Sequence, residues 1–485
     1  MQICTFVSNQ SLMPTDHIQS IRILLKDAGY PNNSQIIPLA SSGSNRKYFR
    51  IIFTDNYYPS TLIASYNNDV RENIAHYSFT EHFRFLGFNV PEIYARDNSY
   101  NYFLIKDLGD ITLFNLLINK RKKACEYYKT AVANLVKFQV QGIKNLDLDV
   151  AYPTRKFTKR SIMWDLNYFK YYFVKPLNID FDENLLEDDF ISISKLLLSA
   201  ENEYFCYRDF QSRNIMVFEN NLWYIDYQGG RQGPLQYDVV SLLYQVKANL
   251  SDDEKDILYN HYLENLNKAL PGKQVQFEKY YSNFIYFRLM QVMGAYGFRG
   301  LVQHKAHFLQ SLPIAINSLS GVLQNSPINA NVPELKRVLN NIASLDYNFT
   351  PESNKGLTIR INSFSYKLKG IPVDYTGNGG GHVFDCRALP NPGRIAELRD
   401  YTGLQQSVIK YLEGQDQVNI FITHTIKIIE QSINDYQLRK FNNLQVNFGC
   451  TGGLHRSVYC ASKISEYINN KFPEVNVDVQ HLEID

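Results

Sequence analysis

The spacing of apolar residues predicts a mixed sheet lobe at the start of the chain. Period-two alternation indicates strands, and a recurrence near 3.6 residues indicates helices. By these criteria residues 1–111 contain an opening helix, several strands and a helix near Glu72–Leu86; strands are predicted at 48–53, 60–66 and within 101–109.

The rest of the chain shows two further patterns. Residues 112–345 carry mostly helical spacing, as in 124–139, which predicts a helical lobe. Residues 346–355 collect Asn, Pro, Ser and Asp without periodicity, which predicts a linker. Residues 356–485 alternate strands, helices and glycine-rich loops, which is typical of a separate α/β domain.

Composition limits the classes of protein that remain. A length of 485 residues exceeds what one core supports, and a formal net charge of +2 gives no bulk attraction for a polyanion. The N-terminus has no charged leader before an apolar core, and no apolar run approaches the roughly 20 residues of a membrane span. The six cysteines form no C-x-x-C pair, which disfavours a disulfide framework and a structural zinc site. We therefore expect a cytoplasmic enzyme that does not cross a membrane.

The segment YRDFQSRNIMVFENNLWYIDYQ, residues 207–228, carries the first candidate site. Asp209 and Asn214 lie five positions apart, and Asp226 follows the apolar run LWYI. Asp and Asn also favour turns and caps, but the apolar run that leads into a second Asp favours a site. A hairpin between the two apolar runs would bring a carboxylate and two oxygen ligands to one cleft, which suits phosphoryl transfer from ATP.

At these residues the chain resembles the aminoglycoside phosphotransferase and choline kinase superfamily, over roughly residues 15–345. The resemblance implies an α+β bilobal protein-kinase-like fold that binds ATP and Mg²⁺. It makes Asp209 the catalytic base and Asn214 and Asp226 the magnesium ligands, with Tyr207 where the family usually has a loop-supporting His. YRDFQSRNIM together with IDYQGGRQGPLQYDVVSLL looks most like the bacterial kinases that phosphorylate the anomeric hydroxyl of N-acetylmuramate or N-acetylglucosamine in cell-wall recycling. Asp238 is expected to anchor the catalytic loop.

The nucleotide side of this site is less marked in the sequence. SSGSNRKYFRI, residues 41–51, stands where the family has its nucleotide-covering turn, and small residues there let backbone N–H groups approach phosphate. The lysine that kinases carry on the third strand has no counterpart in STLIASYNN, so Arg46, Lys47 or Arg50 would have to supply the charge. KDLGD, residues 106–110, is either the segment that flanks adenine or an ordinary turn. The predicted nucleotide-binding residues are Ser42, Gly43, Ser44, Arg46, Lys106, Asp107 and Leu108.

A second candidate site lies in FGCTGGLHRSVY, residues 448–459, between a predicted strand and a predicted helix. Glycines let backbone N–H groups converge, a helix start favours an anion, and Arg456 can fork onto phosphate oxygens. The spacing from Cys450 to Arg456 also equals the C-x5-R pattern of cysteine-dependent phosphatases, although Gly449 stands where their supporting His would be and no general acid is identifiable.

The whole segment 357–485 resembles the C-terminal domain of the RNase adapter protein RapZ, through VFDCRALPNPGRIAELRDYTGLQQSVIKYL and GCTGGLHRSVY. The resemblance implies a pocket for a phosphosugar such as glucosamine-6-phosphate, and oligomerisation through this domain. The implied pocket residues are Asp385, Arg387, Thr451, Gly452, His455 and Arg456, while Gly393 stands where enteric members carry His. Residues 357–485 hold 13 Lys and Arg against 13 Asp and Glu, so RNA is not an expected partner.

Together these features predict a small-molecule kinase of amino-sugar metabolism, with a free sugar as substrate, joined to a phosphosugar-sensing domain. A second class remains open, in which the kinase-like part is catalytically silent and the protein is a phosphosugar-responsive regulator.

Overall fold

In a computed structural model of the chain, side-chain alternation along β2 (Lys47–Phe53) creates a strand with one buried face. Phe49, Ile51 and Phe53 are buried against α1 (Pro14–Asp27), and Tyr48 and Arg50 face a pocket on the other side. This is the period-two pattern that the sequence predicts. The structure describes residues 14–31, 33–39, 46–54, 59–303, 305–326, 328–345, 356–372, 374 and 381–484. The predicted Gly/Ser turn and the predicted linker 346–355 lie outside these residues.

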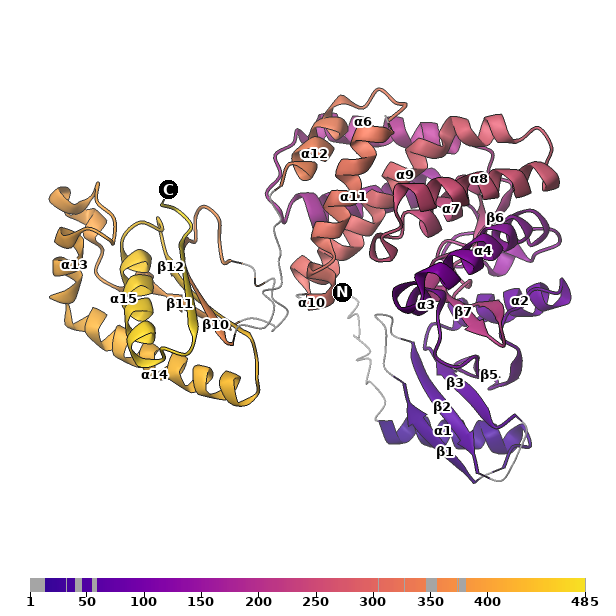
Figure 1. The fold of residues 1–485 in the computed structure, drawn as a ribbon, viewed down its shortest axis with the longest axis horizontal. Helices are drawn as coiled ribbons and strands as arrows, with labels where there is room; N and C mark the ends of the chain where they lie inside the picture. Colours follow the sequence, from indigo (N-terminus) through magenta and orange to yellow (C-terminus); the bar gives the residue numbers. More distant parts are fainter. Residues whose placement is uncertain are drawn as a thin grey trace, which may run out of the picture. The chain divides into compact units, whose positions relative to one another are not determined.

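The N-terminal lobe is built on one antiparallel sheet of five strands (Figure 1). The strand order is β1-β2-β3-β5-β4, with bounds β1 Ser34–Pro38, β3 Thr61–Tyr66, β4 Ile93–Arg96 and β5 Tyr102–Lys106. Helix α2 (Val70–Phe85) follows β3, and the side chain of Asp69 caps it by accepting the Glu72 N–H. The predicted strands and the predicted helix of this lobe are confirmed.

The next part of the chain is mainly helical and contains two short antiparallel pairs of strands, of which β7–β8 is a hairpin. The helices are α3 Leu113–Asn119, α4 Arg121–Gln141, α5 Lys159–Phe169, α6 Glu183–Leu198, α7 Leu235–Leu243, α8 Asp252–Ala269, α9 Gln274–Tyr296, α10 Ala306–Leu309, α11 Leu312–Asn325 and α12 Pro333–Ala343. The strand pairs are β6 Tyr204–Cys206 with β9 Arg231–Gly233, and β7 Ile215–Phe218 with β8 Asn221–Tyr224. A sheet lobe with one inserted helix, followed by a helical lobe that carries a hairpin, is the protein-kinase-like fold predicted from the sequence.

The C-terminal part is an α/β domain with a parallel sheet of order β11-β12-β10-β13. Its elements are β10 Thr358–Ser365, β11 Gly381–Asp385, α13 Gln406–Glu413, α14 Asp416–Leu438, β12 Asn443–Cys450, α15 Arg456–Lys471 and β13 Asn476–His481. Helix α15 packs on β10, β12 and β13 and closes the core. The predicted separate α/β domain is confirmed.

The chain divides into two compact units. The first comprises Met1–Asn167, Asp180–Val292 and Asn317–Ser344, and the second comprises Tyr168–Ile179, Met293–Ile316 and Leu345–Asp485. The exact domain boundaries drawn from the sequence stay predictions. Within the described ranges, no helix is both long enough and apolar enough to span a bilayer.

Candidate active site

Asp238, at the start of α7, fixes the loop that carries Asp209. Its fully buried carboxylate accepts the backbone N–H groups of Tyr207 (2.7 Å) and Arg208 (2.9 Å). Burial raises the pKa of Asp238 to about 7, and the two N–H donors oppose that shift. The Tyr207 hydroxyl donates to the carbonyl of Ile225 (2.7 Å) and ties the loop to the segment before Asp226. The predicted anchoring role of Asp238 is therefore confirmed.

The backbone at both ends of this hydrogen-bonded segment has an unusual conformation. Arg208 has φ +76° and Asp226 has φ +69°, in the left-handed region that residues other than glycine rarely adopt. Such strain persists only where surrounding contacts over-determine the backbone, and it concentrates at functional sites. The two strained positions lie next to Asp209 and at Asp226 itself.

Asn214 joins the two predicted acidic residues. Its Nδ2 donates to the backbone carbonyl of Asp209 (2.9 Å) and to Oδ2 of Asp226 (3.1 Å), while Gln228 Nε2 donates to Oδ1 of Asp226 (2.7 Å). The protein around Asp226 limits its hydration and raises its pKa, and the negative charge of Asp209 raises it further. The β7–β8 hairpin thus brings Asp209, Asn214 and Asp226 together, as the sequence predicts.

The donor set at this site suits Mg²⁺. The Asp226 carboxylate contacts the amide of Asn214, and carboxylate and amide oxygens are ligands that Mg²⁺ prefers. Across the ranges that the structure describes, no three His, Cys, Asp or Glu side chains cluster to enclose a metal. Mg²⁺ commonly takes one or two protein ligands and completes its shell with water and nucleotide phosphate, so a two-residue site fits it.

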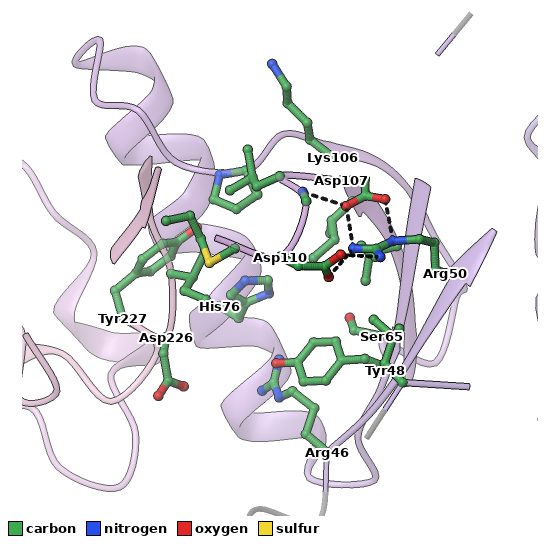
Figure 2. A pocket seen from close by; sticks show the side chains of 18 of the residues that line it. Arg46, Tyr48, Arg50, Ser65, His76, Lys106, Asp107, Asp110, Asp226 and Tyr227 are labelled. Carbon is green, nitrogen blue, oxygen red and sulfur yellow. Dashed lines mark hydrogen bonds and ion pairs between the residues drawn. The ribbon is translucent and has the colours of Figure 1, made fainter. Parts of the chain in front are cut away.

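A cavity of about 210 Å³ lies beside these residues, between the sheet lobe and the hairpin (Figure 2). Its walls come from β2, β3, α2, the segment 106–110 and the residues that flank Asp226. Its lining is mainly apolar and includes Leu39, Ile63, Ile105, Met216 and Ile225, a surface that suits a nucleobase. Asp226 of the acidic cluster also lines the cavity.

The side chains of the predicted segment 106–110 are occupied by other contacts. Lys106 points away from the cavity in Figure 2, and its Nζ lies 4.3 Å from the centre of the Trp223 ring. Asp107 pairs with Arg50 (2.7 Å), and Arg50 also binds Asp110 (2.8 Å). Lys106, Asp107 and Leu108 all line the cavity, and their binding of a nucleotide stays a prediction.

Other predicted and unpredicted residues complete the cavity. Arg46 lines it and pairs with Glu72 of α2 (2.8 Å). Ser42, Gly43 and Ser44 lie outside the described residues. His76 and Gln228 also line the cavity and were not predicted from the sequence. The sequence does place His76 one helical turn after Glu72, and Gln228 two residues after Asp226.

The second predicted site lies at the carboxyl edge of the parallel sheet in the C-terminal domain. Asp385 ends β11, Thr451 and Gly452 follow β12, and His455 and Arg456 start α15. The carboxyl ends of neighbouring parallel strands meet at one edge, where ligands of α/β domains bind. The structure thus gathers all six predicted phosphosugar residues at this edge; Asp385 and Arg387 form an exposed ion pair of 2.7 Å.

Arg456 already has two structural contacts. Its Nη1 donates to the carbonyl oxygens of Arg387 (2.7 Å) and Leu389 (3.1 Å), and its Nη2 lies 3.5 Å from Thr451 Oγ1. The side chain is 5% exposed and its Nε is buried without a hydrogen-bond partner in the described part of the chain. Arg456 therefore holds the turn of Arg387 against the glycine loop, while phosphate binding by Arg456 stays a prediction.

The geometry around Cys450 gives the phosphatase alternative no support. Its Sγ accepts the Gly453 N–H (3.2 Å) and contacts Ser457 Oγ (3.1 Å), but the residue is only 2% exposed. A nucleophilic thiol needs access to the phosphorus atom, and Nη1 of Arg456 is already bonded to two backbone carbonyls.

Comparison with known proteins gives a family match for the C-terminal part. The first unit has a protein-kinase-like fold, with the acidic cluster beside the cavity. Residues 357–485 match the family model described as the RapZ C-terminal domain. A relative called nucleotide-binding protein from Glaesserella parasuis is 42% identical over 125 residues, which is 26% of this chain and 42% of the relative. The chain thus spans less than half the length of that relative.

Solved structures similar to the chain are small-molecule kinases. An ethanolamine kinase of Plasmodium vivax matches 66% of this chain and 92% of its own, at 12% identity and a TM-score of 0.47. An aminoglycoside phosphotransferase, so described, of Ralstonia eutropha matches 67% and 98%, at 10% identity and a TM-score of 0.44. At these values the similarity says nothing of the substrate, which has to be inferred from the site.

Proposed function

We propose that the protein is an ATP- and Mg²⁺-dependent kinase that phosphorylates a sugar or amino sugar, at an anomeric hydroxyl of the N-acetylmuramate or N-acetylglucosamine type. The observation that carries the proposal is the bonded cluster in which Asn214 links Asp209 to Asp226 beside the cavity. Phosphoryl transfer needs mainly positioning and charge neutralisation, and this cluster offers a base and metal ligands within one cleft.

Each side chain has a separate part in the proposed reaction. Asp209 orients the acceptor hydroxyl and accepts its proton as the new oxygen–phosphorus bond forms and the bond to the ADP oxygen breaks. Asn214 and Asp226 would hold Mg²⁺, which neutralises phosphate charge when it is bound. Asp238 and Tyr207 keep the loop in place, so the Asp209 carboxylate is already positioned for the acceptor hydroxyl before the acceptor binds.

The sugar acceptor and the cellular role are inferred from two sequence similarities. The segments 207–216 and 225–243 resemble anomeric sugar kinases of cell-wall recycling, and the chain also carries a RapZ-type domain. In this proposal the C-terminal edge site binds a phosphosugar such as glucosamine-6-phosphate, and a ligand there alters kinase activity only if it binds two states of the protein differently. A homo-oligomer through this domain belongs to the same proposal.

The test is a kinase assay over a panel of free amino sugars, with ATP and Mg²⁺, in which NMR locates the new phosphate. We expect ADP release coupled to phosphorylation of one anomeric hydroxyl. In Asp209→Asn, kcat should fall about 10²- to 10⁴-fold while ATP binding is kept, because a general base contributes on that order.

A silent kinase-like part would give a different result. The parent would then release no ADP with any sugar, and Asp209→Asn would change nothing. Binding of glucosamine-6-phosphate without any turnover would favour the regulator instead of the enzyme.

A further inference from the structure

The strand that should carry the phosphate-binding lysine carries a serine in this chain. Ser65 of β3 lines the cavity, is 2% exposed, and its Oγ has no hydrogen-bond partner among the described residues. A kinase that binds a nucleotide triphosphate needs positive charge at this wall. Since β3 supplies none, the charge has to come from a neighbouring element.

Arg46 lies close to Ser65, the position on β3 where a lysine is missing. In the antiparallel register Tyr48 of β2 pairs with Ser65, and Arg46 lies two residues before Tyr48, on the same face. The Arg46 side chain is 6% exposed and lines the cavity. Figure 2 shows its guanidinium beside the Tyr48 ring, at the end of the cavity away from Lys106 and Asp107.

Hydrogen bonds connect Arg46 to the metal-binding cluster. Arg46 Nη2 donates to Glu72 Oε1 (2.8 Å), and Gln228 Nε2 donates both to that same Oε1 (3.1 Å) and to Asp226 Oδ1 (2.7 Å). The cation of the sheet lobe and the predicted metal ligand are therefore held in one bonded network.

The two other basic residues of β2 have different partners. Lys47 belongs to the opposite face, where its Nζ lies 3.0 Å from His17 Nε2. Arg50 is bound by two carboxylates, those of Asp107 and Asp110, which neutralise its charge at the mouth of the cavity. Of the three basic residues that the sequence leaves open, Arg46 alone is both on the cavity wall and joined to Asp226.

We propose that Arg46 binds the phosphates of the nucleotide and replaces the missing lysine of β3, with Glu72 and Gln228 holding it in register with Asp226. The inference rests on the proposed kinase function and names the residue that recognises the triphosphate. A guanidinium can offer two parallel N–H donors to phosphate oxygens, which a single ammonium cannot.

The test compares two ligands that differ only in their phosphates. Calorimetric titration of the full chain with ATP and Mg²⁺, and separately with adenosine, gives the ratio of the two affinities. In Arg46→Ala we expect ATP to bind about 10- to 100-fold more weakly, the range for losing hydrogen bonds to a charged group, and adenosine to bind as in the parent. Arg84→Ala is the matched control, because Arg84 lies on α2 and pairs with Glu92 away from the cavity wall.

A rescue variant tests the replacement itself. Placing a lysine on β3 through Ser65→Lys in the Arg46→Ala chain should restore most of the lost ATP affinity, since the positive charge returns to the same wall. If Arg46→Ala does not fold, Arg46→Gln removes the charge and keeps a side chain of similar reach to Glu72.

Two results would overturn the assignment. An unchanged ATP-to-adenosine ratio in the Arg46 variants, with or without a parallel loss of both ligands, would show that Arg46 only supports the wall. Failure of Ser65→Lys to restore ATP binding would show that its role is not positive charge. If the parent binds ATP but phosphorylates no sugar, the proposed kinase function fails while the binding test of Arg46 still stands.

Discussion

A histidine in the wall of the nucleotide cavity should make the first unit sensitive to acid. His76 of α2 is 8% exposed, and its Nδ1 is buried without a hydrogen-bond partner in the described part of the chain. Its ring stacks on Tyr227 at 5.6 Å and meets the edge of Phe103 at 5.8 Å. Burial and, to a smaller extent, the positive charge of Arg46 lower the pKa of His76 to about 3.

The size of the effect follows from proton linkage. In the unfolded chain histidine titrates near about 6.5, so below that pH the unfolded state binds a proton that the native state excludes. The stability that neutral His76 provides is present above pH 6.5 and falls as the pH drops toward its folded value. At pH 5 the loss is about 2 kcal/mol relative to pH 7.5, and it stays near that value for any folded pKa below about 4.

The assay uses the two tryptophans of the chain, Trp164 and Trp223, which both lie in the first unit. Urea unfolding followed by tryptophan fluorescence therefore reports on that unit. Between pH 7.5 and pH 5, the parent should lose about 2 kcal/mol more of its free energy of unfolding than His76→Leu does. This double difference cancels the titration of all other groups, and His261→Leu controls for loss of a half-exposed histidine.

A double difference below about 0.5 kcal/mol would refute the reasoning, because linkage then assigns His76 no depressed pKa in the native state. The absolute stability of His76→Leu at pH 7.5 does not decide the matter. Replacing an imidazole with an unpartnered nitrogen by a side chain of similar volume can either cost or add stability.

Three other changes have defined outcomes. In Asp238→Asn, one of the two acceptor oxygens becomes an amide N–H group, which faces a backbone N–H donor and cannot accept its hydrogen bond. The loop that carries Asp209 should therefore shift, and kcat in the kinase assay should fall about 100-fold. Gln228→Ala frees one oxygen of Asp226, and the Mg²⁺ concentration for half-maximal turnover should rise about 10- to 100-fold, with kcat recovered at saturating Mg²⁺. Arg456→Ala leaves two carbonyls without their donor and should destabilise the second unit by about 3 kcal/mol, seen by calorimetry with the tryptophan-reported transition unchanged.

The acidic cluster could be predicted from the sequence because it is local. Asp209, Asn214 and Asp226 lie within 18 residues, and a hairpin between two apolar runs is enough to bring them together. The carboxyl edge of the C-terminal sheet follows in the same way, since a strand, a glycine loop and a helix are consecutive in the sequence. Short-range chain geometry fixes both arrangements.

The wall of the cavity could not be predicted because its contacts join distant segments. Arg46, Glu72 and Gln228 are separated by 26 and 156 residues, and only the packing of α2 between the sheet and the hairpin brings them into contact. The side chain of Lys106 shows the same limit, because its direction depends on Trp223 in a hairpin that follows much later in the chain. The backbone position of that segment is local, but the side-chain contacts are not.

The network around Glu72 gives α2 a role beyond covering the sheet. Glu72 accepts hydrogen bonds from Arg46, Asn67 and Gln228, so one carboxylate fixes groups from the sheet lobe and from the segment after Asp226. The Gln228 amide that donates to Glu72 also donates to Asp226, so Glu72 and Asp226 share one donor. In the proposed kinase, the position of one helix would therefore set both the phosphate-binding cation and the metal ligand, because the same glutamate holds them.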